Sequence, residues 1–157
     1  MIREAKKDEL NLVLEIAHRH AQDAGVAGYD DIDDNHFRQQ LKDAVITPSA
    51  KLLIVFDNMK PVGYSLSTLD EKIWNGALHG HIMLFYIDKE ARNKNIADDL
   101  LAMNEDWFRD NGCLFYHASI MLYDENYKPK DEYIRRAKTY FASSMAEVGY
   151  SFVKGLK

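Results

Sequence analysis

The part of the sequence best suited to bind a charged ligand is a junction between a strand and a helix within residues 84–101. The apolar run 84–87 leads into a short turn, and a helical pattern follows. The first turn of a helix has unpaired backbone N–H groups and a partial positive charge, so this junction is a natural anion site. Arg92 and Lys94 add positive charge to it. The pattern predicts a phosphate-bearing ligand, and the missing glycines exclude a Walker loop and a dinucleotide fingerprint.

Two histidines precede this junction on the same predicted strand. His79 and His81 are separated by one residue, so their side chains lie on one face of an extended chain. Imidazole titrates near neutral pH, which suits a base that takes a proton from an amine. The alternative is that both are hydrogen-bonded residues at the edge of the core. No metal site is predicted, because no further Cys, His or carboxylate has a fitting local spacing.

Hydrophobic spacing predicts the elements that position these residues. The predicted strands cover residues 1–5, 52–56, 62–69, 78–87, 113–122 and 150–156. The predicted helices cover residues 10 to about 25, 36–45, 91–110 and 131–147. Asp33 or Asp34 can cap the second helix, and Asn75-Gly76 signals a hairpin with positive φ at both residues.

This order, β-α-α-β-β-β-α-β-α-β, predicts an α/β (α+β) fold with a mixed sheet. Its antiparallel meander ends in the strand 78–87, which is apolar on both faces and should be central. A helix connects that strand to 113–122, so these two strands should be parallel. The ligand-binding helix 91–110 is the connection.

Composition sets further limits. The chain has 157 residues, of which 46 % are hydrophobic, which predicts one domain over residues 1–157. A formal net charge of −5 argues against a nucleic-acid partner and favours a cationic substrate such as an amine. The single cysteine, Cys113, excludes an internal disulfide. No apolar run reaches the roughly 20 residues that cross a membrane, and the charged start is no signal peptide, so we expect a cytoplasmic protein without a membrane partner.

The run Arg92-Asn93-Lys94-Asn95-Ile96-Ala97 resembles the signature of the GNAT superfamily of acyl-CoA-dependent N-acetyltransferases, which reads Arg or Gln, two residues, Gly, one residue, then Gly or Ala. Its flanks resemble the family as well. These are the opening Ile2-Arg3-Glu4-Ala5, Tyr86-Ile87-Asp88, Leu100-Leu101, Asn111-Gly112-Cys113 and the C-terminal run 142–150. Together with the element order, the resemblance covers the whole chain.

The resemblance implies an acyltransferase that moves an acetyl group from acetyl-CoA (coenzyme A) to a primary amine of a small molecule or a protein. It assigns coenzyme A binding to Arg92, Asn93, Lys94, Asn95, Ile96 and Ala97, and to the main chain of Phe85 and Ile87. The backbone N–H near Ile87 would hold the oxyanion. His81, six residues before Ile87, would be the base, with His79 as second choice. The family also allows a homodimer.

Two residues depart from the family pattern. Asn95 stands in place of glycine, and Met145 stands where the family often has the tyrosine that protonates the thiolate. Tyr140, which is nearby, is the candidate replacement donor. These departures leave two alternatives open: a GNAT-fold binding or regulatory protein with weak or no activity, and an acyltransferase that acts on a macromolecule, including nucleic acid.

Overall fold

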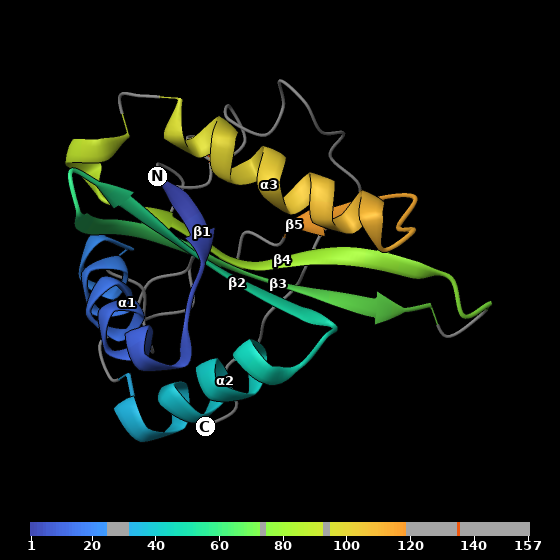
Figure 1. Ribbon diagram of the computed structural model, residues 1–157, viewed down its shortest axis with the longest axis horizontal. Coiled ribbons are helices and arrows are strands. Elements are labelled where there is room, and N and C mark those ends of the chain that lie inside the picture. Colours follow the sequence, from blue (N-terminus) through green and yellow to red (C-terminus); the bar gives the residue numbers. More distant parts are fainter. Residues whose placement is uncertain (25–31, 73–74, 93–94, 119–134, 136–157) are drawn as a thin grey trace. The chain divides into compact units, whose positions relative to one another are not determined.

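The computed structural model describes residues 1–24, 32–72, 75–92, 95–118 and Arg135 (Figure 1). Two compact units divide the chain: Met1–His20 with Asp33–Ser119, and Ala21–Ile32 with Ile120–Lys157. The first unit contains nearly all the described residues and the whole described sheet. The predicted helix 131–147 and strand 150–156 lie outside the described residues, and the single domain over residues 1–157 stays a prediction.

The sheet has the predicted mixed topology. Its five strands are β1 (Ile2–Glu4), β2 (Ala50–Asp57), β3 (Lys60–Glu71), β4 (Leu78–Ile87) and β5 (Tyr116–Ala118), and they neighbour one another in that order (Figure 1). Strands β1 to β4 pair antiparallel, and β4 pairs parallel with β5. The α/β fold class with its meander and its parallel pair is therefore confirmed.

Helices cover both faces of this sheet. They are α1 (Leu10–Ala24), α2 (Asp34–Ile46) and α3 (Ile96–Asp110), with short 3-10 turns at η1 (Lys7–Glu9) and η2 (Lys89–Ala91). Figure 1 shows α3 on one face and α1 with α2 on the other. Asp33 caps α2, as predicted: its carboxylate accepts from the backbone N–H groups of Asn35 and His36.

Three local expectations are wrong. The helix after β4 begins at Ile96 rather than at residue 91, because residues 89–91 form a 3-10 turn. The described strand β5 begins at Tyr116 rather than at residue 113, because Cys113 N–H still donates to Phe108 at the end of α3. Positive φ occurs at Asn58 and Met59 in the β2–β3 turn, whereas in the Asn75-Gly76 pair only Gly76 has it.

The core on the α3 side holds that helix against the sheet through apolar packing and one buried polar group. Residues Leu53, Val55, Val62, Ile87, Ala91 and Leu100 pack together there. Asn104 is fully buried: its Nδ2 donates to Ser65 Oγ at 3.1 Å, and Ser67 Oγ donates to its Oδ1 at 2.8 Å. Because buried polar groups are costly unless paired, these bonds fix the position of α3 over β3.

Candidate active site

A bulge in β4 determines which backbone groups face the β5 edge. Leu66 pairs with Leu84 and Ser67 with Ile82, so Met83 is an extra residue on β4. In an antiparallel pair, residues alternate between facing the partner strand and facing away from it. An extra residue reverses this alternation, so the residues of β4 that face β5 change parity at Met83.

Hydrogen bonds on either side of the bulge confirm this reversal. Before it, Gly80 N–H donates to the carbonyl of Phe115 at 3.1 Å, so Gly80 faces the β5 side. After it, Asp88 N–H donates to Val62 of β3 at 2.7 Å. Ile87, one residue earlier, therefore faces away from β3, and its carbonyl accepts from Arg92 Nε at 2.7 Å. By alternation the N–H groups of Phe85 and Ile87 point to the β5 side of the sheet.

The turn that follows β4 leads directly into α3. Asn95 is the N-cap residue of α3, and its side chain makes no capping hydrogen bond. Its φ of −62° is one that any residue adopts, so this position does not require the glycine of the family signature. Ile96 and Ala97 open the helix and pack partly into the core. Asn93 and Lys94 lie outside the described residues.

Arg92 contacts the end of β4 through its guanidinium group. Besides its bond to Ile87, its guanidinium lies 5.5 Å from the ring centroid of Tyr86, a cation–π contact. The ring of His20 from α1 also stacks on Tyr86, with centroids 4.6 Å apart, and its Nδ1 is 3.1 Å from the hydroxyl of Tyr64. The end of β4 is thus fixed by side chains from α1 and from the turn.

The histidines His79 and His81 lie in a row of stacked rings that joins β4 to β5. The rings of His81 and His117 have centroids 4.1 Å apart and planes inclined by 21°. His79 stacks on His117 at 5.3 Å and on Phe115 at 5.5 Å. Asp70 of β3 lies beside them, with Oδ2 3.7 Å from His81 Nδ1. Among the described residues, no group of three or more His, Cys, Asp or Glu is placed to hold a metal ion.

This environment keeps His81 in its basic form. Burial lowers the pKa of His81 most, and His117 lowers it further, while the carboxylate of Asp70 acts in the opposite direction. Burial also lowers the pKa of His117. At neutral pH the His81 imidazole is therefore mainly uncharged, as a group that accepts a proton must be.

The remaining residues that the sequence analysis singled out, Tyr140 and Met145, lie outside the described residues. Sequence reasoning missed His117 and Asp70. Alternation along residues 116–118 does not show which ring meets His81, because that depends on the register between β4 and β5. The register of the β3–β4 hairpin, Asp70 opposite His79, could have indicated Asp70.

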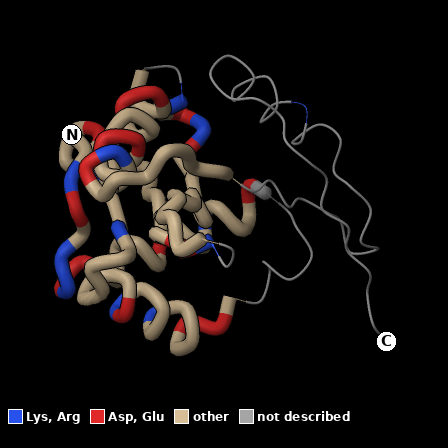
Figure 2. Tube along the Cα trace, turned by 90° about the vertical axis from the view of Figure 1, so that its right-hand side faces the viewer, with Lys and Arg blue, Asp and Glu red and all other residues tan. Residues whose placement is uncertain are grey.

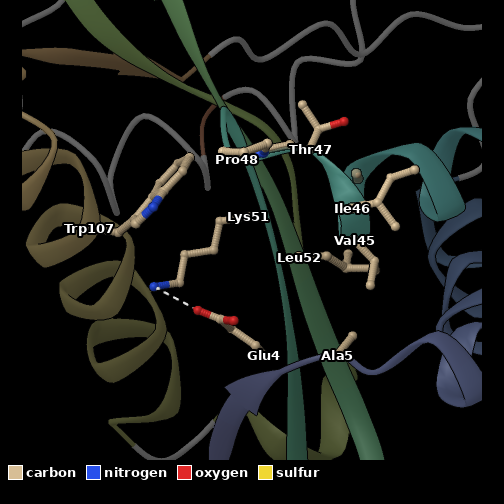
Figure 3. A pocket seen from close by; sticks show the side chains of 11 residues that line it. Glu4, Ala5, Val45, Ile46, Thr47, Pro48, Lys51, Leu52 and Trp107 are labelled. Carbon is tan, nitrogen blue, oxygen red and sulfur yellow. Dashed lines mark ion pairs between the residues drawn. The ribbon is translucent and has the colours of Figure 1, made fainter.

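A groove of about 270 Å³ lies elsewhere, lined by the start of β2, the end of β1, the end of α2 and Trp107, and contains none of the predicted site residues. Figure 3 shows the Lys51 and Glu4 side chains pointing toward one another within it, below Trp107. Lys51 Nζ is 3.3 Å from Glu4 Oε1 and 5.8 Å from the ring centroid of Trp107. These charged groups therefore contact one another.

Solved structures with a similar fold include several acetyltransferases. An aminoglycoside acetyltransferase from an uncultured soil metagenomic sample, in complex with trehalose, is 13% identical, with a TM-score of 0.71 over 100% of this chain and 96% of that chain. A ribosomal-protein-alanine N-acetyltransferase from Brucella melitensis biovar Abortus is 13% identical, with a TM-score of 0.72 over 99% and 98%. An integron cassette protein from the mobile metagenome of Cole Harbour Salt Marsh is 17% identical, with a TM-score of 0.75 over 99% and 89%.

The sequence itself identifies the family. No curated protein sequence matches the chain significantly. The model of the acetyltransferase (GNAT) family matches residues 14–126, which include the bulged strand, the turn after it and α3. The expected resemblance is therefore confirmed, and the chain belongs to the GNAT acetyltransferase family, a family of acyltransferases.

Proposed function

We propose that this protein transfers an acetyl group from acetyl-CoA to a primary amine, with His81 as the general base. The single observation that carries the proposal is the bulge at Met83, which directs the N–H groups of Phe85 and Ile87 to one edge of β4 directly before the N-terminus of α3. Those donors and that helix end are the two parts that a thioester with a diphosphate tail needs.

The described residues fit coenzyme A in one further respect. The Asn95 side chain makes no capping hydrogen bond to the first N–H groups of α3. Arg92 brings positive charge to the same turn. Asp98 and Asp99 bring negative charge to it, which opposes a phosphate. When bound, acetyl-CoA supplies a thioester carbonyl that an amine can attack.

The chain's own groups then have separate tasks. His81 takes the proton that the acceptor amine loses, and its lowered pKa keeps it ready to do so. The N–H of Ile87 donates to the carbonyl oxygen as negative charge develops there. The turn holds the two substrates together, which accounts for much of the rate in such transfers. Tyr140 stays the proposed proton donor.

The acceptor class follows from charge. Acidic and basic residues are interspersed along the described trace (Figure 2), so this part of the chain presents no basic stripe for a phosphate backbone. Asp70, beside His81, favours an acceptor that arrives as an ammonium ion. We therefore propose an amine of a small molecule or a protein rather than of a nucleic acid, with a homodimer and a cytoplasmic location as further expectations. No described helix has the length and apolar character needed to cross a membrane.

The test replaces His81 and measures binding and turnover separately. His81→Ala should lower turnover with a panel of primary amines about 100-fold or more, because general bases typically contribute two or more orders of magnitude. Its affinity for coenzyme A should stay unchanged in calorimetry. Wild-type turnover at every pH would remove His81 as the base. Coenzyme A binding without transfer to any amine would instead favour the alternative, a GNAT-fold binding protein.

A further inference from the structure

The stacked rings beside His81 form a cluster of titratable groups from three strands. His79 and His81 come from β4, His117 comes from β5, and Asp70 comes from β3. In the strand register, His81 is directly opposite His117, and Asp70 is opposite His79. The cluster therefore results from strand pairing and does not depend on a loop.

The geometry of the rings excludes a metal site formed by His81 and His117. Ligands of a metal ion must direct their nitrogen atoms at one point. Here the rings of His81 and His117 lie nearly parallel at 4.1 Å, so they present their faces to one another. This arrangement suits a ring that is held in place and whose protonation is influenced by its neighbours.

We infer that His117 and Asp70 are positioning residues for His81 and that they act on its protonation in opposite directions. His117 fixes the plane of the His81 ring and disfavours a second positive charge beside itself. Asp70 stabilises the protonated ring, which is the form that exists after proton transfer. This inference rests on the proposed function, in which His81 is the base.

The charges on each side give the sign of each effect. His117 stacks directly on His81, so a proton on either ring repels a proton on the other. Asp70 is too far from His81 for a direct hydrogen bond at 3.7 Å, so it acts through its charge. His79 also lowers the pKa of His81, and Lys72 lies at the far end of the stack, 4.3 Å from the Phe115 ring.

The two residues differ in exposure, which decides how each can be replaced. The Asp70 side chain is 46% exposed, whereas His117 is half-buried against the His81 ring. Asp70→Asn therefore changes a half-exposed charge without disturbing the core. His117→Gln removes both the proton and the stacked ring, and either loss raises the pKa of His81.

The experiment is an NMR titration of the His81 imidazole in the full-length protein, with His81→Gln used to assign its resonance. The titration midpoint should move to higher pH in His117→Gln and to lower pH in Asp70→Asn. Glu71→Gln is the matched control: it removes the same charge from the next residue, which alternation places on the other face of β3. That variant should leave the midpoint unchanged.

The acidic limb of the pH–rate profile should move in the same two directions. An unchanged midpoint in Asp70→Asn, or midpoints that move the same way in both variants, would overturn the inference. Asp70→Asn alone decides the matter if His117→Gln does not fold. The titration requires no activity, so its failure is distinguishable from that of the proposed function, which falls if His81→Ala keeps wild-type rates.

Discussion

Arg19 of α1 and Asp88 of the turn after β4 form an ion pair that joins the helix to the candidate site. Arg19 Nε lies 3.0 Å from Asp88 Oδ1, and its Nη2 donates to the carbonyl of Pro61 at 2.8 Å. The Asp88 side chain is only 7% exposed, and that of Arg19 is 35% exposed. A carboxylate this deeply buried depends on its partner, because water cannot replace the lost charge.

Arg19→Ala should lower the free energy of unfolding by about 2 kcal/mol, between the values for surface pairs and fully buried pairs. Urea denaturation measures this loss. Arg109→Ala is the matched control, since its pair with Asp106 has both side chains about two-thirds exposed. The control should lose less than about 0.5 kcal/mol. Equal losses in the two variants would show that burial of Asp88 contributes nothing.

Gly80 allows α3 to approach β4 next to the histidines. A Cβ built on Gly80 would lie 2.5 Å from the ring of Phe108. Gly80→Ala should therefore destabilise the fold by about 2 kcal/mol, the usual cost of overpacking a core. Adding Phe108→Leu should recover part of this loss, because the smaller side chain leaves room for the new methyl group.

Gly112→Ala separates this steric effect from backbone strain. Gly112 has a φ of +77° and open space around it, so alanine there costs about 1 kcal/mol through its conformation alone. Phe108→Leu should not recover that loss. The contact between β4 and α3 would be refuted if Phe108→Leu failed to rescue Gly80→Ala in denaturant titrations.

Local sequence patterns predicted the elements but not the contacts between them. His79 and His81 share a face because alternation is a property of one strand. The neighbour of His81, by contrast, depends on how β4 and β5 pair, and no local pattern in residues 116–118 specifies that register. Asp70 differs, since it lies opposite His79 in the β3–β4 hairpin and that register could have indicated it.

The bulge at Met83 shows a second limit. It decides which N–H groups of β4 face outward, yet the run Leu78–Ile87 contains no proline and no unusual turn residue near Met83. The family resemblance indicated Phe85 and Ile87 as main-chain contacts, whereas the alternation of a regular strand could not. Asn95 shows the reverse case, since the family signature has glycine there but the φ of −62° does not require it.

Glu9 should make stability depend on acid pH. Arg3 donates to Glu9 Oε2 at 2.7 Å and also binds Oε1, and these bonds lower the pKa of Glu9 to about 2. A carboxyl whose pKa is lower in the folded state stabilises the fold above its unfolded pKa, and this contribution is lost as the pH falls toward 2.

Glu9→Gln should therefore be less stable than wild type by about 1 kcal/mol near neutral pH, a value that allows for the partial exposure of the pair. The difference should shrink below the ordinary carboxyl pKa of 4.5. Denaturant titrations from about pH 3 to about pH 7 would measure it. A difference that stays constant over this range would contradict the assignment.

The turn before α3 should respond to charge changes of both signs when coenzyme A binds. Arg92→Ala removes a positive charge and the bond to the Ile87 carbonyl, so it should weaken coenzyme A binding about two- to fivefold. The double variant Asp98→Asn with Asp99→Asn removes two exposed negative charges from the first turn of α3 and should tighten binding by a similar factor.

Calorimetric titration with coenzyme A measures both changes, and added salt should reduce each of them, because exposed charges are screened. Arg109→Ala controls for net charge, since Arg109 lies in the last turn of the same helix. Its affinity should match that of the wild type, because helix-end effects are confined to the nearest turn. If Arg92→Ala and the double variant changed the affinity in the same direction, the diphosphate would not bind at this turn.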